Sequence, residues 1–148
     1  MLWHAVEARP DTVAVIYQDR TITYRDFGRA SNGLAALLES RGLKPGPIVI
    51  MMPNSIEMDV ALMAVMSTGA QVAPVNPFLT VAEVGKVLDG FGATAIVCDP
   101  STQNKANAVA EKIGVTRSGI LIIRNVAMCF DAYLAQMMKE KPVFSKTV

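Results

Sequence analysis

Two kinds of hydrophobic pattern alternate along the chain. Short unbroken apolar runs, typical of strands buried on both faces of a sheet, alternate with longer segments whose apolar residues recur every three or four positions, as on one face of a helix. The runs predict strands over residues 47–52, 71–75, 94–98 and 119–124. The longer segments predict helices over residues 55–68, 80–92, 103–113 and about 131–139. Because one helix separates each pair of successive strands, a right-handed crossover makes the strands parallel, and the sequence predicts a Rossmann-like α/β fold: a parallel sheet with flanking helices.

The N-terminal part of the chain has a different pattern. Residues 13–24 hold two runs of β-branched and aromatic residues around the polar pair Gln18 and Asp19, which predicts an antiparallel β-hairpin. Thr23 followed by Asp26 has the spacing of a helix N-cap, and the helix that follows should end at Gly42. Its buried stripe is predicted to comprise Phe27, Ala30, Leu34, Leu37 and Leu38.

Capping pairs mark the starts of two later helices. Asn54 with Glu57 predicts one start and Thr80 with Glu83 predicts the other, because a short polar side chain and an acid three residues on can satisfy two free backbone donors. The helix that follows Asn54 is apolar nearly all round, so it should be covered on most sides.

The stretch 68–84 contains no side chain that could carry out chemistry by itself. Pro74 and Pro77 fix φ and remove backbone donors on either side of Asn76, and the cap at Thr80 orients the next helix. These features predict a structural loop at the edge of the sheet where the strands end. Direct contact with a ligand is the alternative, but turn and cap chemistry alone account for the residue types.

Composition narrows the functional classes. The 148 residues fall within the range of one domain, so a single α/β domain over residues 1–148 is expected, with a tail from about residue 125 that the pattern defines less clearly. Charge is nearly balanced, 14 Lys plus Arg against 13 Asp plus Glu, which argues against nucleic acid as a partner. No apolar run has the length of a membrane span. With 51% hydrophobic residues, either the core is large or part of the surface expects a partner.

The two cysteines, Cys98 and Cys129, stand in apolar contexts without a CxxC or Cys/His spacing. They are predicted to be buried reduced thiols rather than a disulfide or metal ligands. The start of the chain also lacks the pattern of a secretory signal. Both observations predict a cytoplasmic protein.

Ligands of open α/β sheets bind beyond the carboxyl ends of the strands, so chemistry is expected in the loops that follow the predicted strands. Those loops contain "PNSIE", "NPFLT", "DPSTQ" and "NVAMC". They hold no glycine-rich phosphate loop, no Ser/His/Asp set and no cluster of metal ligands. The sequence therefore predicts no catalytic, cofactor-binding or metal-binding residue in this chain.

Several single residues suggest a function, but each has a simpler structural interpretation. His4, in a terminal helix beside Trp3, is predicted to pack or face solvent rather than act as a general base. Lys105 is predicted to lie on a solvated helix face, with contact to a CoA phosphate as the alternative. Asp99 and Asp131 are predicted to be caps or turn residues. Five methionines are predicted to fill the core, with an adaptable acyl-binding wall as the alternative: Met51, Met52, Met58, Met63 and Met66.

Three segments occur in the order known from one enzyme superfamily. "TITYRDF" resembles an early Thr-Tyr helix entry, "GLKPGPIVIMMPNS" a strand after a Gly-x-x-x-Gly turn, and "MSTGAQVAPVNP" a second core motif. The resemblance is to the N-terminal part of the adenylate-forming superfamily, which includes acyl- and aryl-CoA synthetases, luciferases and peptide-synthetase adenylation domains. "NPFLTVAEV" is most similar to the branch of 4-coumarate-CoA ligase and related acyl-CoA ligases. The similarity covers about residues 10–100 and extends weakly to "FDAYLAQ".

The resemblance implies a reaction and its cofactors. Full-length members bind ATP through a Ser/Thr/Gly-rich loop ending in Lys, form an acyl-adenylate, and then make a CoA thioester with the help of a mobile lysine-bearing C-terminal domain, so ATP, Mg and CoA are implied. This chain has no counterpart of that loop or domain and stops at "KPVFSKTV", where the family would enter the strand before the phosphate loop. We therefore expect the N-terminal fragment of an ATP-dependent acyl- or aryl-CoA ligase, as in fatty acid metabolism, inactive without the remainder of the ligase.

Two other interpretations are open. A self-associating binding or interaction module built on the same scaffold would explain the apolar composition, because a subdomain without its neighbour exposes surface that monomers seldom leave bare. Its partner would be a second copy of the chain. A flavodoxin-like or nucleotide-binding Rossmann domain needs only the layout, and it ranks last because the chain lacks a glycine-rich first turn.

Overall fold

The structure is a computed structural model that describes residues 2–42 and 46–140. At its centre lies a four-stranded parallel sheet with the strand order β4–β3–β5–β6. The strands are β3 (Ile48–Met51), β4 (Val72–Pro74), β5 (Ala95–Cys98) and β6 (Ile120–Ile122). In the register, Ile48 of β3 pairs with Val72 on one side and with Ala95 on the other. The predicted Rossmann-like sheet is confirmed, and each strand is shorter than its apolar run.

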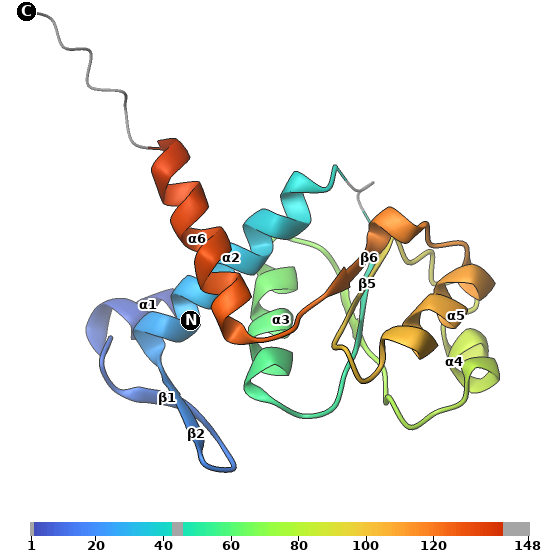
Figure 1. The fold of residues 1–148 in the computed structure, drawn as a ribbon, viewed down its shortest axis with the longest axis horizontal. Coiled ribbons are helices and arrows are strands. Elements are labelled where there is room, and N and C mark those ends of the chain that lie inside the picture. Colours follow the sequence, from blue (N-terminus) through green and yellow to red (C-terminus); the bar gives the residue numbers. More distant parts are fainter. Residues whose placement is uncertain (1, 43–45, 141–148) are drawn as a thin grey trace, which may run out of the picture.

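Helices cover both faces of the sheet, as predicted (Figure 1). One layer consists of α2 (Tyr24–Ser40), α3 (Ile56–Ser67) and α6 (Val126–Glu140), and the other of α4 (Val81–Val87) and α5 (Gln103–Ile113). Alternate residues of a strand enter opposite cores. In β3, Ile48 and Ile50 belong to the core of the first layer, whereas Val49 and Met51 belong to the core of the second.

The predicted N-terminal hairpin is present as the antiparallel strands β1 (Val13–Tyr17) and β2 (Arg20–Thr23). Gln18 at the turn has a φ of 55°, so the turn uses the left-handed region without a glycine. The predicted cap forms as well, because Thr23 Oγ1 accepts a hydrogen bond from Asp26 N at 3.3 Å. The hairpin therefore leads directly into α2.

Two helices cross α2 closely at glycines. The short helix α1 (Leu2–Ala8) passes Gly28, where an added Cβ would lie 2.9 Å from a side-chain atom of Val6. Helix α6 passes Gly33, where an added Cβ would lie 1.9 Å from the carbonyl oxygen of Cys129. The α2–α6 crossing is thus a contact of backbone with backbone, which only glycine permits.

Helix α3 begins differently from the prediction. Ser55, not Asn54, is the N-cap, and its Oγ accepts a hydrogen bond from Met58 N at 3.1 Å. Glu57 does not join a capping box because its carboxylate pairs with the guanidinium of Arg20 through two hydrogen bonds of 2.7 and 3.2 Å. The predicted Asn54–Glu57 capping pair is therefore wrong, and Glu57 instead links the hairpin to α3.

The Glu57 carboxylate lies at a junction of three elements and is only 11% exposed. Burial is the largest influence on its pKa and raises it, but the hydrogen bond from Arg20 and those from the backbone of Glu57 and Val126 together outweigh burial. The pKa of Glu57 consequently lies below its usual value of 4.5. Because Val126 begins α6, this one charge connects the hairpin, α3 and α6.

Helix α4 is shorter than predicted. It ends at Val87, whereas the apolar stripe predicted a helix up to Gly92. The helical spacing of Val84, Val87, Leu88 and Phe91 predicts one apolar stripe. Val84 and Leu88 are buried, but Val87 is 64% exposed and does not belong to a buried stripe. Beyond the helix, two glycines with φ of 69° turn the chain toward β5, at Gly90 and Gly92.

Helix α6 is longer than predicted. It begins at Val126 rather than near residue 131, because Asn125 Oδ1 accepts a hydrogen bond from Met128 N at 3.0 Å and so acts as the cap. Asp131 is an exposed residue inside the helix, and its prediction as a cap or turn residue is wrong. In the ranges 2–42 and 46–140, neither α6 nor any other helix is long and apolar enough to cross a membrane.

Replacing Gly33 with alanine is expected to lower the free energy of unfolding by about 3 kcal/mol, because the added methyl group meets backbone atoms of α6. Urea unfolding followed by circular dichroism measures the change. Gly28→Ala is the matched control, since it gains the same helix propensity but meets only side-chain atoms of Val6 and Trp3, and it should cost much less. Equal effects of the two substitutions would contradict a tight α2–α6 crossing.

Glu57→Gln is expected to reduce stability at pH 7 by about 1–2 kcal/mol, because it removes the charge that Arg20 and the backbone hydrogen-bond. Since the pKa of Glu57 is lowered in the folded state, its contribution is full above the unfolded value near 4.5 and is lost as the pH falls through the folded value. The stability difference between wild type and variant should therefore shrink below pH 4.5. Urea unfolding at a series of pH values measures it, and a difference that stays constant from neutral to acid pH would contradict the assignment.

Candidate functional site

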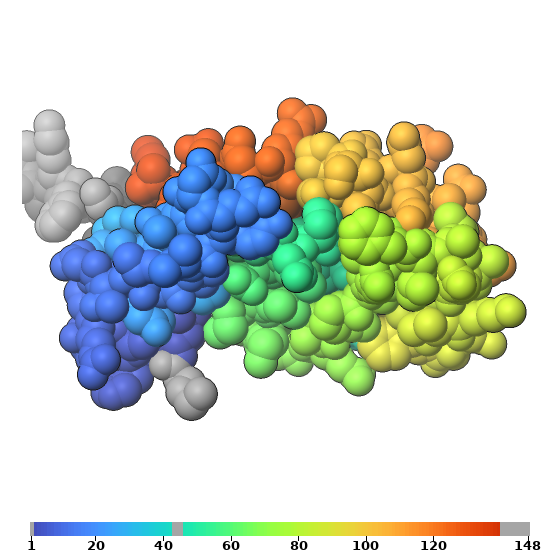
Figure 2. All heavy atoms as spheres, turned by 90° about the horizontal axis from the view of Figure 1, so that it is seen from below, coloured from blue at the N-terminus to red at the C-terminus, as the bar shows by residue number. Residues whose placement is uncertain are grey.

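The loops at the carboxyl ends of β3 and β4 enclose a cleft of about 530 Å³. The hairpin, the start of α3 and the loop after β4 all contribute to its lining, which includes Tyr17, Met52, Asn54, Met58, Asn76 and Phe78. Figure 2 looks onto this edge of the molecule, with the hairpin in blue, the end of β3 in teal and the loop after β4 in light green. Ligands of open α/β sheets bind at the same edge, so this cleft is the candidate site.

Hydrogen bonds within the loop after β4 hold one wall of the cleft. Asn76 Oδ1 accepts a hydrogen bond from Phe78 N at 2.9 Å, which closes an Asx turn. The predicted capping box of Thr80 and Glu83 is confirmed: Thr80 Oγ1 accepts from Glu83 N at 3.2 Å, and Glu83 Oε2 accepts from Thr80 N at 2.8 Å. Hydrogen bonds from the backbone and hydroxyl of Thr80 lower the pKa of Glu83, so the carboxylate stays charged in this role.

Lys105 of α5 holds the same loop from outside. Its ammonium group donates to the carbonyl oxygen of Pro77 and, at 2.9 Å, to that of Leu79. The predicted solvated helix face is therefore wrong for Lys105, whose side chain is partly buried against the loop. Local sequence could not have indicated this contact, because 26 residues separate Lys105 from Leu79.

A second possible ligand position at this edge, between β3 and β5, is occupied by the protein's own side chains. The strand order reverses at β3, which has β4 on one side and β5 on the other, so a ligand would be expected in a crevice between β3 and β5. There, Thr102 Oγ1 donates a hydrogen bond to the carbonyl oxygen of Met51 at 2.7 Å. Asp99 Oδ1 accepts from Thr102 N at 3.0 Å, which confirms Asp99 as a turn residue. The open space at this edge therefore lies over β3 and β4.

The lining of the candidate cleft is uncharged. Its polar groups are the phenol of Tyr17 and the side-chain amides of Asn54 and Asn76, and no lining residue carries a carboxylate or a cation. ATP and CoA bring phosphates, which proteins commonly bind with cationic side chains, and this lining provides none. Over residues 2–42 and 46–140, no group of three or more His, Cys, Asp or Glu could hold Mg or another metal ion.

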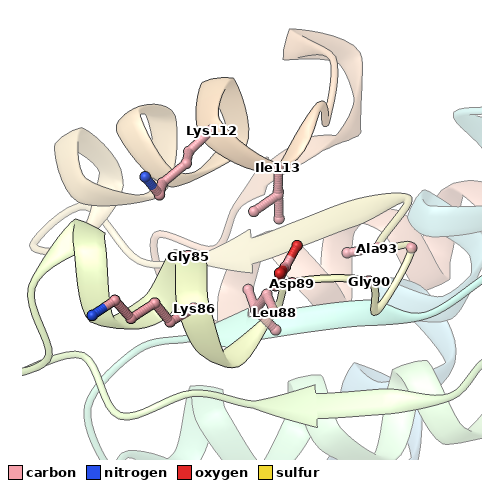
Figure 3. A pocket seen from close by; sticks show the side chains of 9 residues that line it. Gly85, Lys86, Leu88, Asp89, Gly90, Ala93, Lys112 and Ile113 are labelled. Carbon is pink, nitrogen blue, oxygen red and sulfur yellow. The ribbon is translucent and has the colours of Figure 1, made fainter.

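A second cleft, of about 590 Å³, lies at the opposite edge of the sheet, between the ends of α4 and α5 (Figure 3). Lys86, Asp89 and Lys112 are the charged residues in its lining. Figure 3 shows the ammonium ends of both lysines extending away from Asp89. Because these charged groups do not converge, the cleft lacks the arrangement that a ligand site requires.

The other residues singled out in the sequence are His4 and the methionines, and they differ in their exposure. His4 is exposed on α1, in agreement with a packing or solvent role. Met51 and Met52 are buried, and two further methionines pack partly against the core, at positions 58 and 63. Met66 is 57% exposed, so the core-filling prediction is wrong for that residue, and α3 is not covered on this side.

Cys98 and Cys129 are buried free thiols, as predicted. Burial raises the pKa of each thiol to about 12, with a smaller effect from the charge of Asp99 on Cys98 and of Glu57 on Cys129. Both thiols are therefore protonated at neutral pH and do not act as nucleophiles.

Comparison with known proteins identifies the family. The family model described as "AMP-binding enzyme" matches residues 2–143. Bacitracin synthase 2 of Bacillus licheniformis is 34% identical over 100 residues, which cover 67% of this chain and 4% of that protein. Gramicidin S synthase 2 of Brevibacillus brevis is 36% identical over 85 residues, which cover 57% of this chain and 2% of that protein. The chain belongs to the AMP-binding family of adenylate-forming enzymes, and it spans only a few per cent of the length of these curated relatives.

Solved structures share the fold. The inhibitor-bound N-terminal domain of FACL13 from Mycobacterium tuberculosis superimposes with a TM-score of 0.74 at 23% identity, covering 88% of this chain and 34% of that one. A benzoate CoA ligase from Burkholderia xenovorans LB400 gives a TM-score of 0.75 at 20% identity, covering 88% of this chain and 27% of that one. These likenesses establish the fold, and the resemblance to adenylate-forming enzymes is confirmed.

Lys105→Met is expected to loosen the loop after β4 without unfolding the sheet, because it removes the donor to two carbonyls and keeps the apolar stem. Amide hydrogen exchange at Phe78 and Leu79 should accelerate about tenfold while exchange in β5 stays unchanged. Lys112→Met, at an exposed position of the same helix, is the control and should alter neither. Equal acceleration in loop and sheet would contradict a local role for Lys105.

Proposed function

We propose that residues 1–148 form the N-terminal subdomain of an ATP-dependent acyl- or aryl-CoA ligase, an enzyme that activates a carboxylic acid as an acyl-adenylate and then transfers the acyl group to CoA. The observation that carries the proposal is the family match across residues 2–143. One feature favours a CoA ligase within that family: "NPFLTVAEV" resembles the branch of 4-coumarate-CoA ligase and related acyl-CoA ligases, with fatty acids among the candidate substrates.

The uncharged cleft supports a scaffolding role for this subdomain within the ligase. Its lining offers no cationic side chain for the phosphates of ATP or CoA, and the described residues offer no cluster of three or more possible metal ligands. We infer that a phosphate loop and a lysine-bearing C-terminal domain supply those groups, and that the chain is inactive without them. Its partner is then the remainder of the ligase. The cytoplasm is the proposed compartment, because both cysteines are free thiols.

A second candidate function is a self-associating binding module that retains the scaffold without the enzyme. A specific observation favours it: large apolar side chains are strongly exposed on several elements, at 71% for Ile16, 87% for Phe78 and 76% for Met138. Apolar surface of this kind usually marks an interaction site. The partner in this case is a second copy of the chain.

The purified chain is expected to release no pyrophosphate from ATP when fatty or aromatic acids are added, because its cleft carries no cationic side chain to bind the phosphates. A coupled pyrophosphate assay with benzoate CoA ligase as the positive control measures this. Sustained, acid-dependent turnover by the chain alone would contradict the proposed inactivity.

A chimera tests the ligase assignment itself. Residues 1–140 replace the matching N-terminal segment of the benzoate CoA ligase, and acyl-adenylate formation is measured alongside circular dichroism. Retained adenylation supports the assignment, whereas a folded chimera without adenylation counts against it.

A further inference from the structure

Strand β6 forms one edge of the four-stranded sheet, and the ladder fixes which of its residues face outward. Ile123 N donates to the carbonyl oxygen of Cys98 at 2.8 Å. In a parallel ladder, residues that bind the neighbouring strand alternate with residues that face away from it. Leu121 therefore faces β5, whereas Ile120 and Ile122 turn their backbone N–H and C=O groups outward. Such an outward row of backbone groups is a template for pairing with another strand.

Both outward groups of Ile120 have partners within the chain. Its N–H donates to the carbonyl oxygen of Arg117, in the 3₁₀ turn that precedes β6. Its carbonyl oxygen accepts a hydrogen bond from Arg41 Nη1 at 2.9 Å, and the same nitrogen donates to the carbonyl oxygen of Ser118 at 3.0 Å. Arg41 directly follows α2 and is 79 residues from Ile120 in the sequence. Its guanidinium therefore lies across the start of the β6 edge.

Ile122 is the outward residue of β6 whose backbone is open. Among the hydrogen bonds of residues 2–42 and 46–140, none takes its outward N–H or C=O. The segment around it, residues 119–123, is uncharged, lacks proline and consists mostly of isoleucine and leucine, a composition that favours strand pairing between chains. A strand that approaches this edge can use only Ile122 unless it displaces Arg41.

The opposite edge of the sheet, β4, is closed by a different residue. Val75 N donates to the carbonyl oxygen of Ile50 at 2.8 Å, so Pro74 faces outward. Proline has no N–H to offer to a further strand. Prolines and charged side chains are the residues with which natural sheets commonly protect their edges, and here one edge carries each kind.

A second copy of the chain is the strand donor that fits the β6 edge. In an antiparallel pair across a two-fold axis, the outward N–H and C=O groups of one edge match those of the same edge in the other copy. The segment that follows α6 is not placed at this edge. Helix α3 leads from β3 to β4 on the layer that also holds α6, so a right-handed crossover through α6 turns toward β4 and away from the β6 edge.

We propose that Arg41 closes the β6 edge of the sheet to strand pairing between two copies of the chain. Its guanidinium occupies the carbonyl group that a second strand needs beside Ile122, and its charge disfavours the approach of an identical edge. The inference goes beyond both candidate functions and depends on neither, because it concerns one edge of the sheet and not a catalytic site or an exposed apolar face.

Arg41→Met tests the proposal, because it keeps the aliphatic stem and removes the donor and its charge. Sedimentation equilibrium of the full chain should show self-association at least about tenfold tighter than in the wild type, since no charged hydrogen bond has to be displaced. Arg117→Met is the matched control. Arg117 is an exposed arginine beside the same edge, and within the described residues its side chain makes no hydrogen bond to β6, so the variant should associate as the wild type does.

Amide hydrogen exchange locates the association. In Arg41→Met the N–H of Ile122 should exchange about tenfold more slowly than in Arg117→Met, because a second strand then covers it. This protection together with the tighter association supports the proposal. Equal association of the two variants, or an Ile122 amide that stays unprotected, overturns it. An Arg41→Met chain that remains as monomeric as the wild type, or that unfolds by circular dichroism, also overturns it, because Arg41 is then only a stabilising contact.

Discussion

Every residue of the central strands β3 and β5 is buried, so the chain has to supply an apolar layer on each face of the sheet. The layer of α4 and α5 comes from the crossovers that join the strands. The opposite layer consists of three helices. Only α3 joins two strands of the sheet, whereas α2 precedes the sheet in the chain and α6 follows it. The close crossing at Gly33 and the Glu57 charge are the devices that hold this composite layer together.

The carboxyl edge of the sheet has few polar side chains that are free to bind a ligand. Polar side chains are present there, but they satisfy the chain's own backbone: Thr102 binds Met51, Asn76 binds Phe78, and Lys105 binds the loop after β4. What is left open is a neutral, apolar cleft. This neutral cleft is consistent with the proposed role of the chain as a scaffolding subdomain, in which the groups that bind phosphate come from other segments.

Much of the fold could be predicted because its determinants are local. Apolar runs marked all four strands, and the caps at Thr23 and Thr80 depend on residues three positions apart. The predictions were wrong where a residue's role depends on a contact with a residue distant in the sequence. Glu57 has the spacing of a capping acid but binds Arg20, 37 residues away, so the cap passes to Ser55. Lys105 looked like a surface lysine for the same reason. Two segments of the cleft, in the loops after β3 and β4, were expected from the rule that ligands bind beyond the carboxyl ends of the strands. The contribution of Tyr17 could not be predicted, because the hairpin is distant in sequence and reaches the cleft only through the tertiary fold.

The two cores also differ in how far apart in the chain their members lie. The core beneath α4 and α5 uses residues between Val49 and Ile122 that are joined by short crossovers. The core beneath α2 brings Phe27 and Leu34 together with Val126 and Cys129, and the loop between them spans most of the polypeptide. During synthesis on the ribosome, which proceeds from the N-terminus, this second core stays unsealed until α6 has left the exit tunnel. The part of α2 that α6 crosses at Gly33 therefore stays uncovered until α6 is synthesised, even though α3 can already pack on α2.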